Sequence, residues 1–144
     1  MKYMAKKKNM TQVWLETSVV PVTTLELSKD NESSSSFFKE RKEGDVITIS
    51  GISKGKGFQG VVKRHGFGGG PKSHGQKDRL RAPGSLGPTA PQRVIKGRKM
   101  AGHTGNRRVT LKNVRVAKLD EANNLVMVKG AVPGMKGSRV EIRI

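Results

Sequence analysis

Three glycines spaced as Gly55-x-Gly57-x-x-Gly60 follow the apolar segment DVITIS, and they are the first candidates for chemistry. This spacing occurs where a strand presents a dinucleotide's phosphates to the N-terminus of a helix, and it would indicate a dinucleotide-binding enzyme. The next residues are VVKRHGFGGGPKSHG, in which four glycines and a proline within ten positions disfavour a helix. We therefore predict that no stable helix begins after Gly60 and that this is not a dinucleotide site.

Histidines and acids offer little else for catalysis. His65, His74 and His103 are the only histidines, and the chain has no cysteine, so a zinc site is not favoured. Contact with phosphate or stacking on a base is the expected role of His65 and His74, with a merely solvated side chain as the alternative. General acid and base chemistry usually needs more than one carboxylate, and residues 51–108 contain only Asp78. We predict no catalytic residue, metal, cofactor or small-molecule substrate.

Charge is the dominant property of the chain. There are 29 Lys and Arg against 11 Asp and Glu, which gives a formal net charge of +18. Such a surface repels itself unless a polyanion neutralises it, so nucleic acid is the expected partner. A membrane is not, because the sequence shows neither a basic amphipathic helix nor an apolar run of about 20 residues. The first residues lack the apolar stretch of a signal peptide, and the absence of cysteine suits a reducing compartment.

The elements that must position these residues are mainly strands. Near-alternation around Val20 and Val22 predicts strands within residues 11–27, and Trp14 is expected in the core. The serine run and mixed charges of residues 29–45 predict a loop or linker. Strand character returns at residues 46–50 and 58–63.

The last third also has the pattern of a β protein. In VTLKNVRV the apolar residues change parity, which predicts a bulge near Lys112 and Asn113. Residues 121–124 and 132–137 are expected to be turns, each followed by a strand, which gives two hairpins. With β segments at both ends of the chain, we expect a small barrel or sandwich that is closed by the two termini.

Residues 51–108 form what we call the excursion, a glycine-rich and proline-rich stretch with fourteen Lys and Arg and one acid. It cannot form a packed core alone, and we expect it to become ordered on a polyanion, with a flexible linker as the alternative. Close approach of backbone to RNA is assigned to Gly55, Gly57, Gly60, Gly84 and Gly87. The predicted phosphate and RNA contacts are Lys54, Lys56, Lys63, Arg64, His65, Lys72, His74, Arg79, Arg81, Arg93, Lys96, Arg98, Lys99, Arg107 and Arg108.

Four segments in order make the sequence similar to a known family. GISKGKGFQGVVKRHGFGGGPKSHG, RAPGSLG, RVIKGRKMAGHTGNRRVTLKNVRV and NNLVMVKGAVPGMKGS closely resemble the bacterial type of the ribosomal protein L3 (uL3) family. MTQVW and VVPVTTLE also match the beginning of that family. The resemblance covers most of residues 10–28 and nearly everything from residue 44 onward.

The resemblance implies a six-stranded β-barrel of the translation-protein type with a long, basic, extended arm. The barrel would comprise residues 1–50 and 109–144, and the arm 51–108 would have its tip near residues 84–92. Members bind large-subunit rRNA early in assembly, contact neighbouring large-subunit proteins and extend the arm toward the peptidyl-transferase centre without performing chemistry. The implied location is the ribosome, in the bacterial cytoplasm or in an organelle.

Two departures from the family pattern and one alternative function remain. Members normally carry several dozen more residues where this chain has residues 29–45, which leaves open whether the barrel is complete around residues 29–43. At the tip, Ala90 takes the place of a glutamine that is N-methylated in some relatives, so that modification is not expected here. The alternative function is a free-standing RNA-binding module or RNA chaperone, which would need base-stacking aromatic residues on a sheet face.

Overall fold

A computed structural model describes residues 2–15, 18–28 and 31–144. Contacts divide the chain into two compact units. The barrel unit consists of residues 1–54 and 106–144, and the excursion unit consists of residues 55–105.

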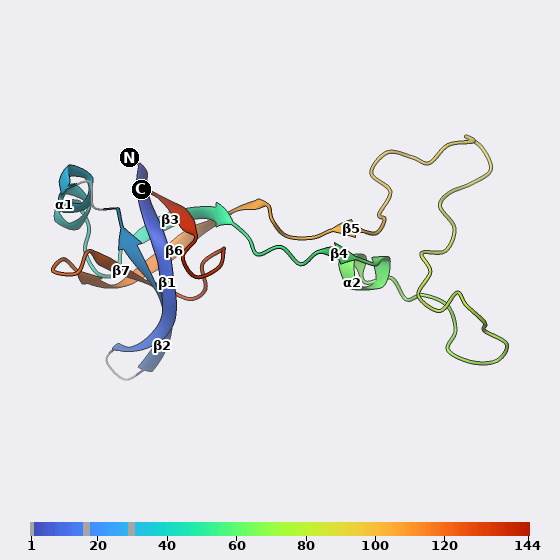
Figure 1. The fold of residues 1–144 in the computed structure, drawn as a ribbon, viewed down its shortest axis with the longest axis horizontal. Helices are drawn as coiled ribbons and strands as arrows, with labels where there is room; N and C mark the ends of the chain where they lie inside the picture. Colours follow the sequence, from blue (N-terminus) through green and yellow to red (C-terminus); the bar gives the residue numbers. More distant parts are fainter. Residues whose placement is uncertain (1, 16–17, 29–30) are drawn as a thin grey trace. The chain divides into compact units, whose positions relative to one another are not determined.

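The barrel unit is a closed barrel of six antiparallel strands in the order β1-β2-β7-β6-β3-β8 (Figure 1). The strands are β1 (Lys2–Leu15), β2 (Ser18–Leu27), β3 (Val46–Ile52), β6 (Arg108–Asp120), β7 (Leu125–Lys129) and β8 (Arg139–Arg143). Closure leaves no long unpaired edge, which removes the groups that would otherwise template pairing with another chain. The predicted barrel is thus confirmed, and it is closed without a strand from the described residues 31–43.

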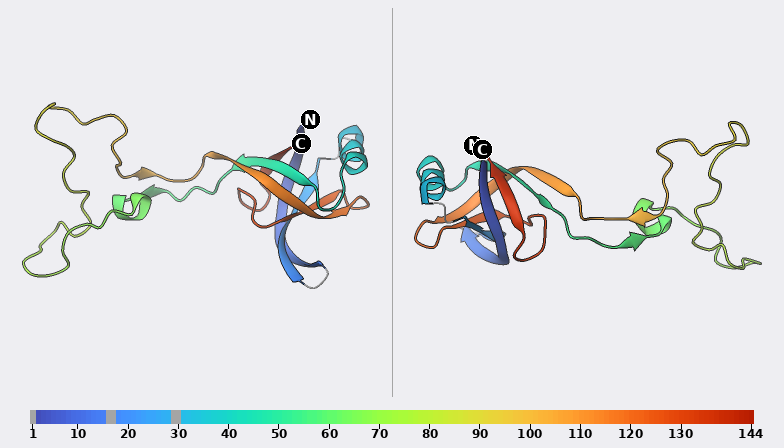
Figure 2. Two further views of the ribbon diagram at one scale, coloured as in Figure 1. Left: turned by 180° about the vertical axis from the view of Figure 1, so that it is seen from behind. Right: turned by 45° about the horizontal axis from the view of Figure 1, so that its top comes forward.

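The two ends of the chain complete the barrel, as the sequence predicted. Strand β1 pairs with β8, and Lys2 stands opposite Arg143 in the register. The N- and C-termini lie side by side in every view (Figures 1 and 2). The first half of β1, for which no strand was predicted, alternates between inward Tyr3, Ala5 and Lys7 and outward Lys2, Met4 and Lys6.

Inward side chains of all six strands form the core of the barrel. Leu25, Ile49, Val126 and Ile142 are fully buried there, in line with their alternation with outward polar residues. Burial of such side chains contributes about 1.5–3 kcal/mol each relative to exposure, so this cluster is the main source of stability of the unit.

The loop predicted for residues 29–45 is wrong over most of its length, because helix α1 (Asn31–Glu40) forms there. The helix is held by its two aromatic residues: Phe37 and Phe38 are buried in the barrel core, and the ring of Phe37 meets Tyr3 edge-to-face at 5.1 Å between centroids. Serine is a poor helix former, so packing rather than local propensity decides this element. Residues 29 and 30 lie outside the described residues.

The bulge predicted near Lys112 and Asn113 is confirmed. Ile47 pairs with Val114 and Ile49 with Leu111, so two residues of β6 face the single Thr48 of β3. Asn113 adopts a left-handed conformation with φ of 57°, which asparagine tolerates better than most residues. The bulge explains why the apolar parity of β6 changes at this point.

Two other predictions for the barrel unit are wrong. Only one of the two expected hairpins forms: β6 and β7 pair across the turn at residues 121–124, whereas β8 pairs with β1 and β3 instead of β7. Trp14 is not in the core but 71% exposed, opposite Val19 on the outer side of the β1–β2 ladder. Its neighbour Val13 faces inward there, so strand alternation turns Trp14 outward.

The excursion unit contains little regular structure. It comprises β4 (Phe58–Gln59), α2 (Val61–His65) and β5 (Gly102–His103), with β4 and β5 paired antiparallel. The strand predicted for residues 58–63 therefore ends at Gln59. Throughout residues 55–105, which the structure describes completely, Val61 is the only buried residue.

Candidate nucleic-acid interface

A short helix begins after Gly60, contrary to the sequence prediction. Helix α2 has five residues and ends at Gly66, which adopts φ of 73°. The β-branched pair Val61 and Val62 favours a strand by propensity, but the buried Val61 and contacts from the last helical turn override it. The helix is too short for a dinucleotide fold, and the adjoining sheet is antiparallel rather than parallel.

Contacts from α2 hold the two branches of the excursion unit together. The Arg64 guanidinium donates to the Met100 carbonyl at 2.8 Å, and the His65 ring lies 3.0 Å from the same oxygen through Nε2. Gly102 lies so close to Arg64 that a side chain there would clash with the guanidinium. Arg64 and His65, both predicted to contact RNA, thus also have a structural role within the unit.

The glycines predicted to approach RNA closely differ in backbone conformation. Gly57, Gly84 and Gly87 have φ of 69°, 80° and 157°, a region in which other residues are strained. For Gly57, Gly60 and Gly84, an added side chain would meet nothing within 4 Å in the protein itself. Space beside the backbone at these positions is therefore open to a ligand.

The other predicted RNA contacts lie on the surface. Arg98 donates to the carbonyl of Ser85, and His74 has a left-handed backbone with φ of 59°. Lys54 belongs to the barrel unit, as do Arg107 and Arg108. The remaining cations of the prediction are exposed in the excursion unit: Lys56, Lys63, Lys72, Arg79, Arg81, Arg93, Lys96 and Lys99.

A hollow of about 750 Å³ lies within the excursion unit. Phe67 and Arg79 contribute to its wall, together with the triple glycine 68–70 and residues 82–85. The amide of Gly70 donates to the carbonyl of Leu80 at 2.9 Å, which holds the two sides of the hollow together. Phenylalanine, arginine and glycine are residue types that stack on a base or bind a phosphate.

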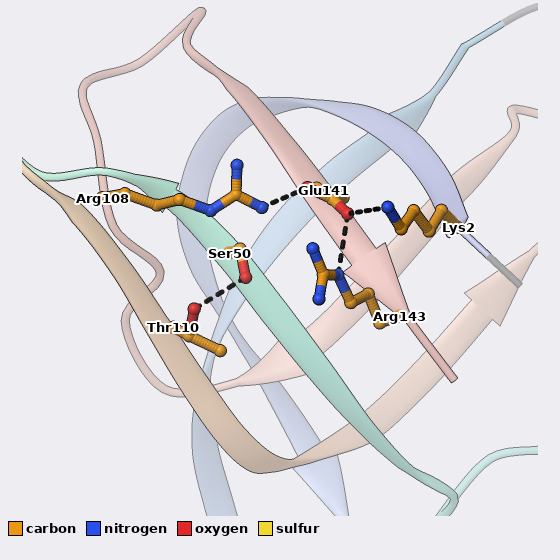
Figure 3. A network of polar contacts seen from close by, with 6 residues as sticks. All are labelled: Lys2, Ser50, Arg108, Thr110, Glu141 and Arg143. Atoms are coloured by element: carbon orange, nitrogen blue, oxygen red, sulfur yellow. Dashed lines mark hydrogen bonds and ion pairs between the residues drawn. The ribbon is translucent and has the colours of Figure 1, made fainter.

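The outer face of the barrel carries a second group of cations, and sequence analysis recognised only Arg108 of it. Glu141 forms ion pairs with Lys2 at 3.8 Å, with Arg143 at 2.7 Å and with Arg108 (Figure 3). Hydrogen bonds from Arg143 and Arg108 lower the pKa of Glu141 to about 2. The alternation in RVEIRI is the signal that would have found the site, because it turns Arg139, Glu141 and Arg143 outward together.

Lys7 is the one buried lysine of the described residues. Its ammonium donates to the carbonyls of Val132 at 2.6 Å and Gly134 at 2.9 Å, so it fixes the loop that precedes β8. Burial lowers the pKa of Lys7, and the nearby Lys54 charge lowers it further. The strand β1 thus holds this loop through a charged side chain as well as through its backbone.

Together, these features define a class of protein: a closed, strongly basic β-barrel that carries a glycine-rich basic excursion suited to a polyanion. Among the described residues there is no cluster of three or more potential metal ligands. No helix in the described part of the chain is long and apolar enough to span a membrane.

Comparison with known proteins assigns the family. The family profile described as "Ribosomal protein L3" matches residues 2–124, and the chain belongs to this family. The resemblance inferred from the sequence is therefore confirmed.

Similar curated proteins are each named "Large ribosomal subunit protein uL3". The protein of Chloroherpeton thalassium is 52% identical over 118 residues, which cover 81% of this chain and 55% of that protein. Those of Dehalococcoides mccartyi and Chlorobaculum tepidum are 56% and 55% identical over 71% and 70% of this chain, and over 50% and 49% of their own lengths. The chain thus spans about half the length of the curated relatives it matches.

Proposed function

We propose that the chain is a structural constituent of the large ribosomal subunit that binds large-subunit rRNA. Membership of the L3 family, which is a structural ribosomal family and not an enzyme family, supports the assignment. The observation that carries it is the excursion unit, where eleven Lys and Arg stand against Asp78 and only one residue is buried. A surface of this charge releases condensed counterions when it lies on phosphates.

The excursion acts as an arm that enters rRNA early in subunit assembly. Its lysines and arginines neutralise phosphates, and its glycines let the backbone pass close to RNA. The tip near residues 84–92 points toward the peptidyl-transferase centre in this proposal. Neighbouring large-subunit proteins contact the barrel, and the protein resides on the ribosome in the cytoplasm of a bacterium.

Cations of the excursion are the main phosphate contacts in this proposal. Lys54, Lys56, Lys63, Arg64, Arg98, Lys99, Arg107 and Arg108 form this set. Among them, Arg64 and Arg98 also hold backbone carbonyls within the excursion unit, and Arg108 pairs with Glu141. Substitution of these three would disturb structure as well as charge, so a test of binding should use others.

A salt titration tests the phosphate contacts directly. The variant Lys56→Gln, Lys63→Gln, Lys99→Gln and Arg107→Gln removes four exposed positive charges. Binding to an in vitro transcript of bacterial large-subunit rRNA is measured over a range of salt concentrations. The slope of log K against log salt is expected to fall by about 3 units, since each single-strand phosphate contact contributes about 0.7.

A matched variant separates contact from general charge. Lys39→Gln, Lys42→Gln, Lys118→Gln and Lys129→Gln removes the same charge from exposed positions of the barrel unit. If both variants lower the slope equally, the excursion is not the binding element. If the wild-type protein does not co-sediment with large subunits at moderate salt, the ribosomal role is wrong and a free-standing RNA-binding module is the better description.

A further inference from the structure

The outer face of the β1–β8 ladder places like charges directly opposite each other. Lys2 stands opposite Arg143, and Lys6 stands opposite Arg139. Directly opposed like charges destabilise a strand pair. Within the β1–β8 ladder the only acid of this face is Glu141, opposite Met4 between the two cationic pairs, and Glu26 of the neighbouring strand β2 stands opposite Lys6. Such a face is stabilised when an anion binds to it.

Glu141 organises the cations around itself without neutralising them. Its side chain is 15% exposed, whereas those of Lys2, Arg108 and Arg143 are 68%, 57% and 45% exposed. One carboxylate therefore holds three positive groups, and the cluster keeps a net charge of +2. Each guanidinium has five N–H donors and uses only part of them on Glu141, which leaves donors free on the solvent side.

Strand β3 supplies a fixed floor to the cluster. Ser50 stands opposite Glu141 on one side and Thr110 on the other, so the three residues form one row across β8, β3 and β6. The hydroxyls of Ser50 and Thr110 lie 2.9 Å apart, and Ser50 is almost completely covered. Figure 3 shows Arg108 and Arg143 on either side of this pair. The cations are thus presented by paired strands, not by a loop.

We propose that Glu141 is a positioning residue that holds Lys2, Arg108 and Arg143 to bind a backbone phosphate of RNA. The outer face of β1, β8 and β3, together with Arg108 at the start of β6, is then a second RNA-contact surface, formed by residues of the barrel unit and not of the excursion unit. This inference rests on the proposed function, since it specifies a further surface through which the same RNA is bound.

A repeated anion fits this face better than a single one. The second cationic pair, Lys6 and Arg139, lies four residues along the strands from the first, a distance of about 13 Å at the usual rise per residue. A free phosphate ion would occupy one of these groups, whereas an RNA strand presents phosphates to both. Planar guanidinium groups match the geometry of a phosphate.

The substitution Glu141→Gln distinguishes positioning from simple charge. It removes a negative charge from a basic surface, so long-range electrostatics alone predicts tighter RNA binding. Positioning predicts the opposite, a Kd for the rRNA transcript that rises about 3- to 10-fold because the free guanidinium groups lose their fixed geometry. The control Glu121→Gln makes the same charge change in the exposed β6–β7 turn and is expected to leave Kd unchanged or slightly lower.

A second variant tests the same face without altering Glu141, in case Glu141→Gln fails to fold. Lys6→Gln with Arg139→Gln leaves the Glu141 cluster intact and is expected to lower the salt slope by about 1.4 units. Thermal unfolding of every variant confirms that the barrel is folded. Unchanged or tighter RNA binding by Glu141→Gln overturns the inference. The inference is also overturned if Glu141→Gln weakens binding to phosphatidylserine vesicles but leaves the Kd for RNA unchanged. Failure of the wild-type protein to bind the transcript would instead overturn the proposed function.

Discussion

The barrel unit and the excursion unit are stabilised by different interactions, although one chain forms both. In the barrel unit, inward apolar residues such as Leu25 and Ile142 are completely buried. In the excursion unit, Val61 alone is buried, and the contacts are mostly those of backbone and of long cationic side chains with carbonyls. A unit that buries so little apolar surface cannot offset the entropy of ordering its chain. We therefore expect the barrel unit to fold in the absence of RNA and the excursion unit to become ordered when it binds RNA.

The largest expected effect comes from a comparison of one phenylalanine in each unit. Phe37 is completely buried between α1 and the barrel, whereas Phe58 of β4 is 65% exposed. Phe37→Ala is expected to lower the free energy of unfolding by about 3–5 kcal/mol, because a buried ring is lost and a cavity remains. Phe58→Ala is expected to change it by less than about 0.5 kcal/mol. Urea unfolding followed by circular dichroism measures both.

Equal effects of the two phenylalanine variants would contradict the comparison. A small effect of Phe37→Ala would also mean that α1 does not pack on the barrel, because its contact with Tyr3 depends on this ring.

A medium-sized effect is expected from the buried ammonium of the barrel unit. Lys7→Met keeps an unbranched side chain but removes the ammonium, which leaves the carbonyls of Val132 and Gly134 without their donor. The expected loss is about 1–3 kcal/mol of unfolding free energy, the cost of buried polar groups left unpaired. The neighbouring Lys6→Met is the control, since Lys6 is exposed and should contribute less than about 0.5 kcal/mol. Full stability of Lys7→Met would show that the ammonium does not hold the loop.

The smallest expected effect is that of the Glu141 ion pairs, and it disappears at acid pH. The pKa of Glu141 is lowered from 4.5 to about 2 in the folded protein, so its contribution is present above pH 4.5 and is lost as the pH falls toward 2. Glu141→Gln should therefore be less stable than the wild type near neutral pH, and the two should converge toward the acid end of this window. Thermal unfolding at a series of pH values measures the difference. A difference that stays constant down to about pH 2 would show that Glu141 is not engaged by its cations.

Predictions from sequence succeeded where the signal is local. Alternation of side chains located most of the strands, and the parity change in β6 located the bulge at Asn113. The excess of charge in the excursion was likewise visible residue by residue. Predictions failed where a distant contact decides. Trp14 was expected in the core, but its pairing with Val19 places it on the outer side of the β1–β2 ladder, whereas Phe37 and Phe38, in a stretch with a loop-like composition, are buried in the core together with Tyr3.

The features of the candidate site also divide into those that local sequence predicts and those that depend on distant contacts. The cations of the excursion could be named in advance because charge is a property of composition, whereas the contacts of Arg64 and His65 with Met100 could not. These contacts join residues 35 and more positions apart, which no local pattern encodes. The cluster around Glu141 was missed for the same reason, because its four members come from both ends of the chain and from the start of β6.

The sequence by itself determined the chain's β character, its basic surface and the family to which it belongs, because alternation, charge and motif are carried by neighbouring residues. Only the tertiary structure decided which strands are partners. A hairpin between β7 and β8 was the nearest choice along the chain, yet β8 lies between β1 and β3, where it closes the barrel and leaves neither terminal strand as an open edge. That closure brings Lys2 to Arg143 and creates the cationic outer face.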